Sequence, residues 1–237
     1  MEQSRKETIR SNVLNLINNV SEISAKYERS YDDITIIAVT KRFPAEYAKL
    51  AYECGLENLG ENRVDELLTK REILLSEGIL PKWHMIGTLQ RKKVKKTVGN
   101  TSLIHSVESI KLADEISVVS IKEDINTSVL LQVNLSGEST KQGFTKIQIL
   151  ESFEELIKIK NLSIKGLMTM APFTDNEYLL EKTFSDTYEL FCQLKDKNVE
   201  AKEFNLLSMG MSNDYKFAIK HGATHIRIGT AIFGDRT

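Results

Sequence analysis

The feature that most constrains the fold of this chain is a repeated alternation of short apolar runs with amphipathic segments. The clearest run, at positions 34–39, reads Ile-Thr-Ile-Ile-Ala-Val and is rich in β-branched residues. Such a run is typical of a strand buried on both faces, as in a parallel sheet. Eight candidate strands can be placed in this way, at 34–39, 57–60, 83–86, 103–105, 128–134, 162–168, 203–207 and 224–228.

Helical patterns separate most of these runs, and a further helix precedes the first. Its apolar positions step by four, four and three residues: Ile9, Val13, Ile17 and Val20. Thr145 with Gln148 resembles a capping box, and Asn176 is a candidate N-cap. The alternation predicts a parallel sheet, and eight units favour a closed (β/α)8 barrel of the TIM type with an extra N-terminal helix. An open doubly wound sheet is the alternative.

Length and composition support a single globular domain spanning residues 1–237. A chain of 237 residues suits one barrel, and a hydrophobic fraction of 41% allows a sizeable core. The formal net charge of −1 gives no general attraction to nucleic acid or to anionic membranes. No secretory signal and no apolar run of membrane-spanning length is present, and Cys54 and Cys192 show no metal-type spacing. We therefore expect a cytoplasmic protein without a metal site.

In such a barrel the active face lies at the carboxyl ends of the strands. Most residues that follow the predicted strands can bind or react. They are Lys41, Glu61, Asn62, Gly87, His105, Ser106, Asn134, Met168, Ser208, Arg227, Gly229 and Thr230.

Lys41 is the most informative of these residues because it follows the most apolar strand almost directly. Burial lowers the pKa of a lysine, and a neutral amine condenses with an aldehyde. The alternative is a lysine whose charged end reaches solvent at the strand end, and position alone favours that alternative.

The loops after the last two strands resemble phosphate-binding loops. Ser212 and Asn213 stand where a helix N-cap belongs, and Gly229 with Thr230 opens a short segment at 231–234. TIM barrels commonly bind phosphate on backbone N–H groups in these two loops. Ordinary capping by Ser212 and Thr230 is the alternative.

Arg227 stands between Ile226 and Ile228, so its side chain points to the opposite side of the strand from its neighbours. If it faces the barrel interior, its guanidinium needs an acceptor, which a ligand or a carboxylate could supply. Arg91 opens a basic run that ends at Lys96 and lacks interleaved aromatic residues, which favours a solvated face over a specific nucleic-acid site.

Seven short stretches in order along the chain resemble the pyridoxal phosphate (PLP) homeostasis proteins, a family of small PLP-binding barrels related to the N-terminal domain of alanine racemases. They are Ala38-Val39-Thr40-Lys41, Gly60-Glu61-Asn62, Trp83-His84-Met85-Ile86-Gly87, Leu89-Gln90, Gly166-Leu167-Met168, Leu207-Ser208-Met209-Gly210-Met211-Ser212 and Arg227-Ile228-Gly229-Thr230-Ala231-Ile232-Phe233-Gly234. Arg42, Thr88 and Arg91-Lys92 depart from the family pattern at the rim of the pocket.

The resemblance implies a role for each matching position. Lys41 would carry PLP as a Schiff base, Asn62 would lie near its ring, and Arg227 would face its pyridine nitrogen. The phosphate would be contacted by Ser208, Gly229 and Thr230, with Ser212 close by.

We expect a carrier that binds PLP reversibly and serves vitamin B6 homeostasis, with PLP and PLP-dependent apoenzymes as its partners. We expect it to be a monomer, to bind no specific nucleic acid and no membrane, and to have no catalytic residues of its own. A racemase needs a second base, which the related racemases take from a second domain, and a charged arginine at the ring nitrogen weakens carbanion stabilisation. A PLP-dependent amino-acid racemase, or a Schiff-base aldolase acting on a phosphorylated substrate, remains the alternative.

Overall fold

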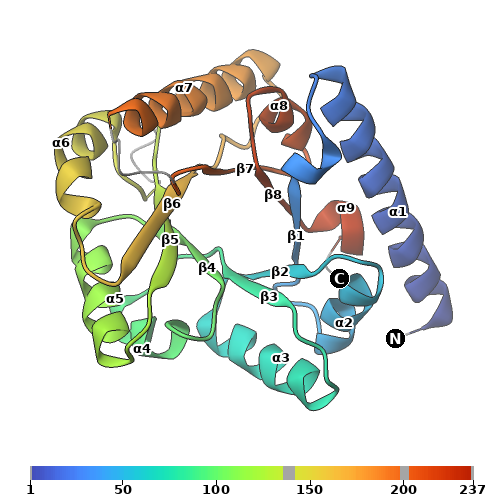
Figure 1. Ribbon diagram of the computed structural model, residues 1–237. Coiled ribbons are helices and arrows are strands. Elements are labelled where there is room, and N and C mark those ends of the chain that lie inside the picture. Colours follow the sequence, from blue (N-terminus) through green and yellow to red (C-terminus); the bar gives the residue numbers. More distant parts are fainter. Residues whose placement is uncertain (1, 136–141, 198–202, 236–237) are drawn as a thin grey trace.

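The computed structural model describes residues 2–135, 142–197 and 203–235. Within them, eight parallel strands close into a barrel in which each strand pairs with the next and β8 pairs with β1 (Figure 1). The strands are β1 Thr35–Val39, β2 Asn58–Glu61, β3 Lys82–Met85, β4 Leu103–Val107, β5 Thr127–Gln132, β6 Leu162–Met168, β7 Leu206–Met211 and β8 His225–Ile228. The predicted (β/α)8 barrel is confirmed.

Helices form a ring around the strands (Figure 1). They are α1 Gln3–Lys26, α2 Ala45–Glu53, α3 Val64–Ser76, α4 Val94–Thr97, α5 Ile110–Lys122, α6 Lys146–Leu156, α7 Glu177–Asp196, α8 Tyr215–Lys220 and α9 Thr230–Phe233, with short 3-10 turns at Tyr31–Asp33 and Arg91–Lys93. The predicted capping box of Thr145 and Gln148 and the Asn176 N-cap are both confirmed. Ser212 and Asn213 do not cap α8, because that helix begins later, with Asp214 as its N-cap.

The seventh strand lies further along the chain than the predicted segment at 203–207. It runs through Gly210, which has a φ of +95°. A glycine in this conformation is typical of a turn, so the sequence favours a strand that ends before it. A Cβ at Gly210 would lie 2.6 Å from the Cβ of Ala218, so the missing side chain allows α8 to pack closely on β7. Strand pairing therefore continues past the point at which the glycine suggests a turn.

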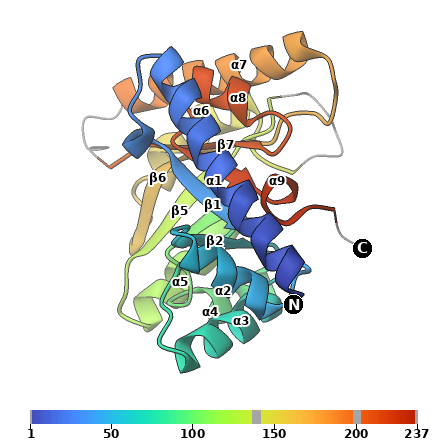
Figure 2. The same cartoon turned by 90° about the vertical axis from the view of Figure 1, so that its right-hand side faces the viewer.

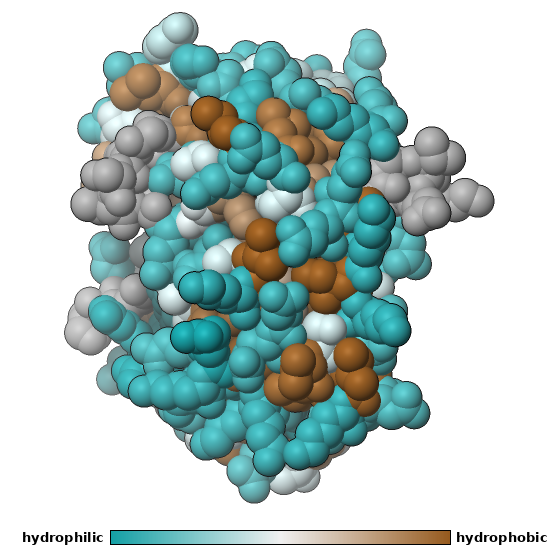
Figure 3. Space-filling model, turned by 90° about the vertical axis from the view of Figure 1, so that its left-hand side faces the viewer, coloured by the Kyte–Doolittle hydropathy of each residue, from teal (hydrophilic) through white to brown (hydrophobic). Residues whose placement is uncertain are grey.

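The main apolar core lies between the barrel and its helices, and the barrel interior is partly polar. Ile226 and Ile228 belong to the outer layer, which places Arg227 in the interior. A small apolar cluster fills part of that interior and consists of Leu103, Leu130 and Met168 with Leu206. The outer surface is largely hydrophilic, with separated hydrophobic areas on the face that carries α5 and α6 (Figure 3). Isolated exposed apolar side chains such as Val118 and Ile147 are normal on the surface of a globular fold.

The extra N-terminal helix α1 packs against α2, α8 and α9 along one side of the barrel (Figure 2). Its buried apolar face consists of Ile9, Val13, Leu16 and Val20, and the predicted Ile17 is partly buried and packs against the same core. Asn12 donates to the carbonyl of Ile232 at 3.0 Å and Arg5 to that of Phe233 at 3.3 Å. These bonds attach α1 to α9. No described helix combines the length and apolarity needed to cross a bilayer.

Candidate functional site

A cavity of about 780 Å³ opens at the carboxyl ends of the strands. The family resemblance assigns PLP contacts to seven residues, and six of them line this cavity: Lys41, Asn62, Ser212, Arg227, Gly229 and Thr230. The loop after β6 contributes Met170, Pro172 and Phe173, and Asp214 contributes a carboxyl group. Sequence reasoning did not single out these last four residues, although the loop directly follows the predicted sixth strand.

Lys41 is presented to the cavity by a tight turn that follows β1. The carbonyl of Thr40 accepts a hydrogen bond from the N–H of Phe43 at 3.0 Å, which closes a four-residue turn. Within the turn formed by residues 40–43, Arg42 alone has a positive φ, at +65°. Arg42 is the third residue of the turn, and a positive φ at that position is typical of a type II turn. Lys41 itself is partly buried.

Arg227 is buried in the barrel interior and also lines the cavity. Its Nη1 donates to the Ser208 hydroxyl at 2.6 Å and its Nη2 to the carbonyl of Thr169 at 2.8 Å. Burial lowers the pKa of Arg227 to about 10, and Asp214 opposes the shift. The guanidinium therefore stays charged at neutral pH, and it donates to one hydroxyl and one carbonyl oxygen.

Ser208 lies beneath the cavity and connects Arg227 to a column of histidines. Its Oγ is 2.9 Å from His105 Nδ1, and His105 Nε2 is 2.9 Å from His84 Nδ1. His84 Nε2 is 3.0 Å from the Asn58 carbonyl oxygen. Burial is the first cause of the lowered pKa of His84, to about 3, and it lowers the pKa of His105 well below its usual value. Both rings are therefore neutral.

Neutral rings fix the direction of every hydrogen bond in this column. Because the Asn58 oxygen only accepts, His84 Nε2 carries a proton and His84 Nδ1 accepts from His105 Nε2. His105 Nδ1 must then accept from the Ser208 hydroxyl, whose oxygen accepts from Arg227. The donors point from Arg227 to Asn58, which lines a second cavity of about 470 Å³ at the amino ends of the strands. His84 is buried and hydrogen-bonded, and it also lines this second cavity.

Two backbone N–H groups at the start of α9 converge on one oxygen at the cavity wall. The hydroxyl of Ser212 accepts from the N–H of Gly229 at 3.3 Å and from that of Ala231 at 3.2 Å. Gly229 is buried, whereas Thr230 is exposed at the mouth. This arrangement brings together the loops after β7 and β8, as the sequence predicts.

Two further sequence expectations concern residues outside the cavity. Most of the basic run from Arg91 to Lys96 is exposed, and Lys93 and Lys96 form ion pairs with Asp65. Among the described residues, no group of three or more histidine, cysteine or acidic side chains could hold a metal ion.

Comparison with known proteins identifies the family of this chain. A family model described as "Alanine racemase, N-terminal domain" matches residues 12–237. The pyridoxal phosphate homeostasis protein of Aquifex aeolicus is 40% identical over 205 residues, which cover 85% of this chain and 86% of that protein. The protein of the same name from Haemophilus influenzae is 35% identical over 224 residues, which cover 94% of each chain. The chain belongs to the pyridoxal phosphate homeostasis protein family.

Solved structures agree with this assignment to the pyridoxal phosphate homeostasis family. PipY of Synechococcus elongatus PCC7942, determined with PLP bound, is 30% identical, with a TM-score of 0.80 over 91% of this chain and 100% of that chain. Alanine racemase of Clostridium difficile 630 is 20% identical, with a TM-score of 0.76 over 97% of this chain and 57% of the racemase. The racemase likeness shows the shared barrel fold.

Proposed function

We propose that this protein binds PLP reversibly as a Schiff base on Lys41 and acts as a carrier in vitamin B6 homeostasis. The observation that carries the proposal is one cavity in which a lysine, a buried guanidinium and two converging backbone N–H groups meet. The family membership and the PLP-bound relative support it. When bound, PLP supplies an aldehyde that condenses with amines, including those of apoenzymes.

The cavity residues fit the chemical groups of PLP. The Ser212 oxygen shows that the N–H groups of Gly229 and Ala231 hold an acceptor at the wall, where a phosphate oxygen could also be held. Thr230 adds a hydroxyl at the mouth, and Asn62 adds an amide to the cavity wall. These residues form the proposed phosphate and ring contacts.

Ser208 has a different place from its predicted role as a phosphate contact. Its side chain is fully buried, its hydroxyl contacts His105 and Arg227, and it is not among the residues that line the cavity. We therefore assign Ser208 to the support of Arg227, because a hydroxyl that accepts from the guanidinium fixes its position.

The environment of Arg227 favours a carrier over an enzyme. A guanidinium has no acceptor, so at the pyridine nitrogen it favours the unprotonated ring, which withdraws electrons weakly. The histidines nearest to Arg227 in the column, His105 and His84, are buried below the cavity and are not among its lining residues. Neither is placed to exchange a proton with an amino acid bound in that cavity.

Borohydride reduction of the PLP-loaded protein, followed by peptide mass mapping, tests the site. We expect a pyridoxyl adduct on the peptide that contains Lys41 and its loss in the Lys41→Ala variant. Lys82→Ala, which removes a surface lysine from the other end of the barrel, is the control and keeps the adduct. An adduct on another lysine in the wild type would overturn the site assignment.

Two further measurements separate the carrier from its alternatives. The loaded protein should restore activity to a PLP-dependent apoenzyme and should not interconvert alanine or serine enantiomers. Steady turnover of either amino acid would establish the racemase instead. A protein that takes up no PLP but forms a reducible adduct with a sugar phosphate would establish the aldolase.

A further inference from the structure

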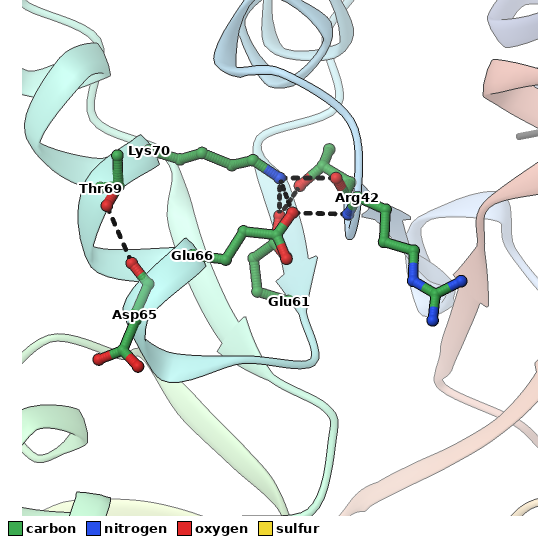
Figure 4. A network of polar contacts seen from close by, with 7 residues as sticks. Arg42, Glu61, Asp65, Glu66, Thr69 and Lys70 are labelled. Atoms are coloured by element: carbon green, nitrogen blue, oxygen red, sulfur yellow. Dashed lines mark hydrogen bonds and ion pairs between the residues drawn. The ribbon is translucent and has the colours of Figure 1, made fainter. Parts of the chain in front are cut away.

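A buried ion cluster lies directly behind the turn that carries Lys41 (Figure 4). Lys70 of α3 extends toward the end of β1, and its ammonium group has three acceptors. It donates to Glu61 Oε1 at 2.5 Å, to the Thr40 carbonyl at 2.7 Å and to Glu66 Oε1 at 2.8 Å. All three donors of the lysine are thereby used.

The cluster holds the backbone on both sides of Lys41. On one side, the Thr40 hydroxyl donates to Glu61 Oε1 at 2.5 Å and its carbonyl accepts from Lys70. On the other side, the N–H of Arg42 donates to Glu66 Oε1 at 2.5 Å. The left-handed φ of Arg42, +65°, is unfavourable for a residue with a side chain and persists only where neighbouring contacts enforce it.

Burying these charges is not an efficient way to stabilise a barrel. The Lys70 and Glu61 side chains are 5% and 0% exposed. Burial raises the pKa of the Glu61 carboxyl even though Lys70 and Thr40 oppose the shift, and Glu61 Oε2 is buried without a hydrogen-bond partner among the described residues. Apolar side chains of similar volume commonly stabilise a core as well as a buried ion pair does, or better. What this cluster adds is a defined conformation at one place, the turn around Lys41.

We infer that Lys70, held by Glu61 and Glu66, is a positioning residue that sets the turn from which Lys41 captures the PLP aldehyde. The inference rests on the proposed function, because it assumes that Lys41 is the amine that forms the Schiff base. The proposed phosphate contacts and Arg227 come from β7, β8 and the loops that follow them, none of which contributes a residue to the cluster, so the cluster should affect capture of the aldehyde more than binding of the phosphate.

The test compares two ligands that differ only at the reacting carbon: PLP and deoxypyridoxine phosphate, which has no aldehyde. Fluorescence titration gives the affinity of each ligand for the wild type and for Lys70→Met, which keeps the length of the side chain and removes its donors. A hydrogen bond to a charged group contributes about 1.5–3 kcal/mol, so we expect PLP affinity to fall by about tenfold or more. The affinity for deoxypyridoxine phosphate should stay unchanged.

Lys93→Met is the matched control. Lys93 forms an ion pair at the surface with Asp65, which lies on α3, the helix that also carries Lys70. We expect Lys93→Met to leave both affinities unchanged. If Lys70→Met does not fold, Glu66→Ala and Glu66→Gln replace it, since Glu66 is 22% exposed. The glutamine keeps an acceptor for the Arg42 N–H and should retain PLP affinity, whereas the alanine should lose about fivefold.

The outcomes separate this inference from the proposed function. Unchanged affinities in the Lys70 and Glu66 variants, or a parallel loss for both ligands, would overturn the positioning role while reduction of the wild type still labels Lys41. Failure to label Lys41 in the wild type would remove the proposed function itself. A selective loss of PLP affinity, with the control unaffected, establishes the positioning role.

Discussion

Three buried histidines should make the stability of this barrel strongly dependent on pH. Burial lowers the pKa of His84 to about 3 and that of His225 to about 4, and it lowers the pKa of His105 as well. In the unfolded chain a histidine titrates near 6.5, so below that pH the unfolded state binds more protons than the folded state. Stability is therefore full above about pH 7 and is lost as the pH falls toward the folded pKa values.

The magnitude follows from the two pKa values of each group. Between pH 7.5 and pH 5, an unfolded histidine of pKa 6.5 gains about 2 kcal/mol from protonation, and a folded one of pKa 3 to 4 gains almost nothing. His84 and His225 together give about 4 kcal/mol, a large part of the stability of a typical domain, and the lowered pKa of His105 acts in the same direction. Glu61 and Asp214 act in the opposite direction, because burial raises the pKa of each carboxyl in the folded state.

His225→Gln isolates one histidine from these other groups. His225 is 8% exposed, and its Nδ1 lies 3.0 Å from the Thr224 hydroxyl. We expect the free energy of unfolding to change by about 2 kcal/mol less between pH 7.5 and pH 5 in the variant than in the wild type, whatever its stability at neutral pH. Thr224→Val is the control, because it removes that hydrogen bond and leaves the imidazole; it should be less stable but keep the wild-type pH dependence.

Urea unfolding at pH 7.5, 6 and 5, followed by the fluorescence of Trp83, measures these differences. Trp83 is the only tryptophan of the chain, is 3% exposed and stands next to His84. Equal pH dependence in His225→Gln and the wild type would refute the reasoning, since it would mean that His225 is protonated to the same degree in both states. It would also argue against neutral rings at His84 and His105, on which the hydrogen-bond directions in the histidine column depend.

Substitutions at three further positions test other parts of the site. Arg42→Gly should keep or increase stability, whereas Arg42→Val should lose about 1–2 kcal/mol because its φ is left-handed; equal urea midpoints would contradict the turn geometry. Gly87→Ala would place a Cβ 2.6 Å from the Cα of Asn62, so PLP affinity measured by titration should fall, and an unchanged affinity would argue against a role for Asn62. Ser208→Ala leaves His105 Nδ1 without its donor and should reduce the free energy of unfolding by about 1–3 kcal/mol, while an unaltered stability would show that the column tolerates a gap.

The sequence predicts the site well where it depends on strand order. The run at 34–39 is so apolar that the predicted strand differs from β1 by one residue, and Lys41 follows from it directly. Because closing a parallel barrel brings all carboxyl ends to one face, Asn62, Arg227 and Gly229 could be grouped before any geometry was known. β7 extends beyond the predicted segment because Gly210, which has a positive φ, continues the strand instead of ending it.

Contacts that depend on side-chain direction across the barrel could not be predicted. Ser208, His105 and His84 come from three different strands, and nothing in their spacing shows that they form one column. Lys70 lies in a helix rich in charged residues, where a lysine is expected to face solvent, and its partner Thr40 is thirty positions away. In each case the deciding information is a long-range contact.

The attachment of α1 to α9 also affects how this protein can be made. During synthesis, α1 leaves the ribosome well before α9, yet Asn12 and Arg5 of α1 donate to the carbonyls of Ile232 and Phe233 in α9. The apolar face of α1 therefore cannot be fully covered until α9 has left the ribosome. Gly229 and Thr230 stand at the start of α9, so a nascent chain acquires the loop that we propose to hold the PLP phosphate and the cover of α1 together.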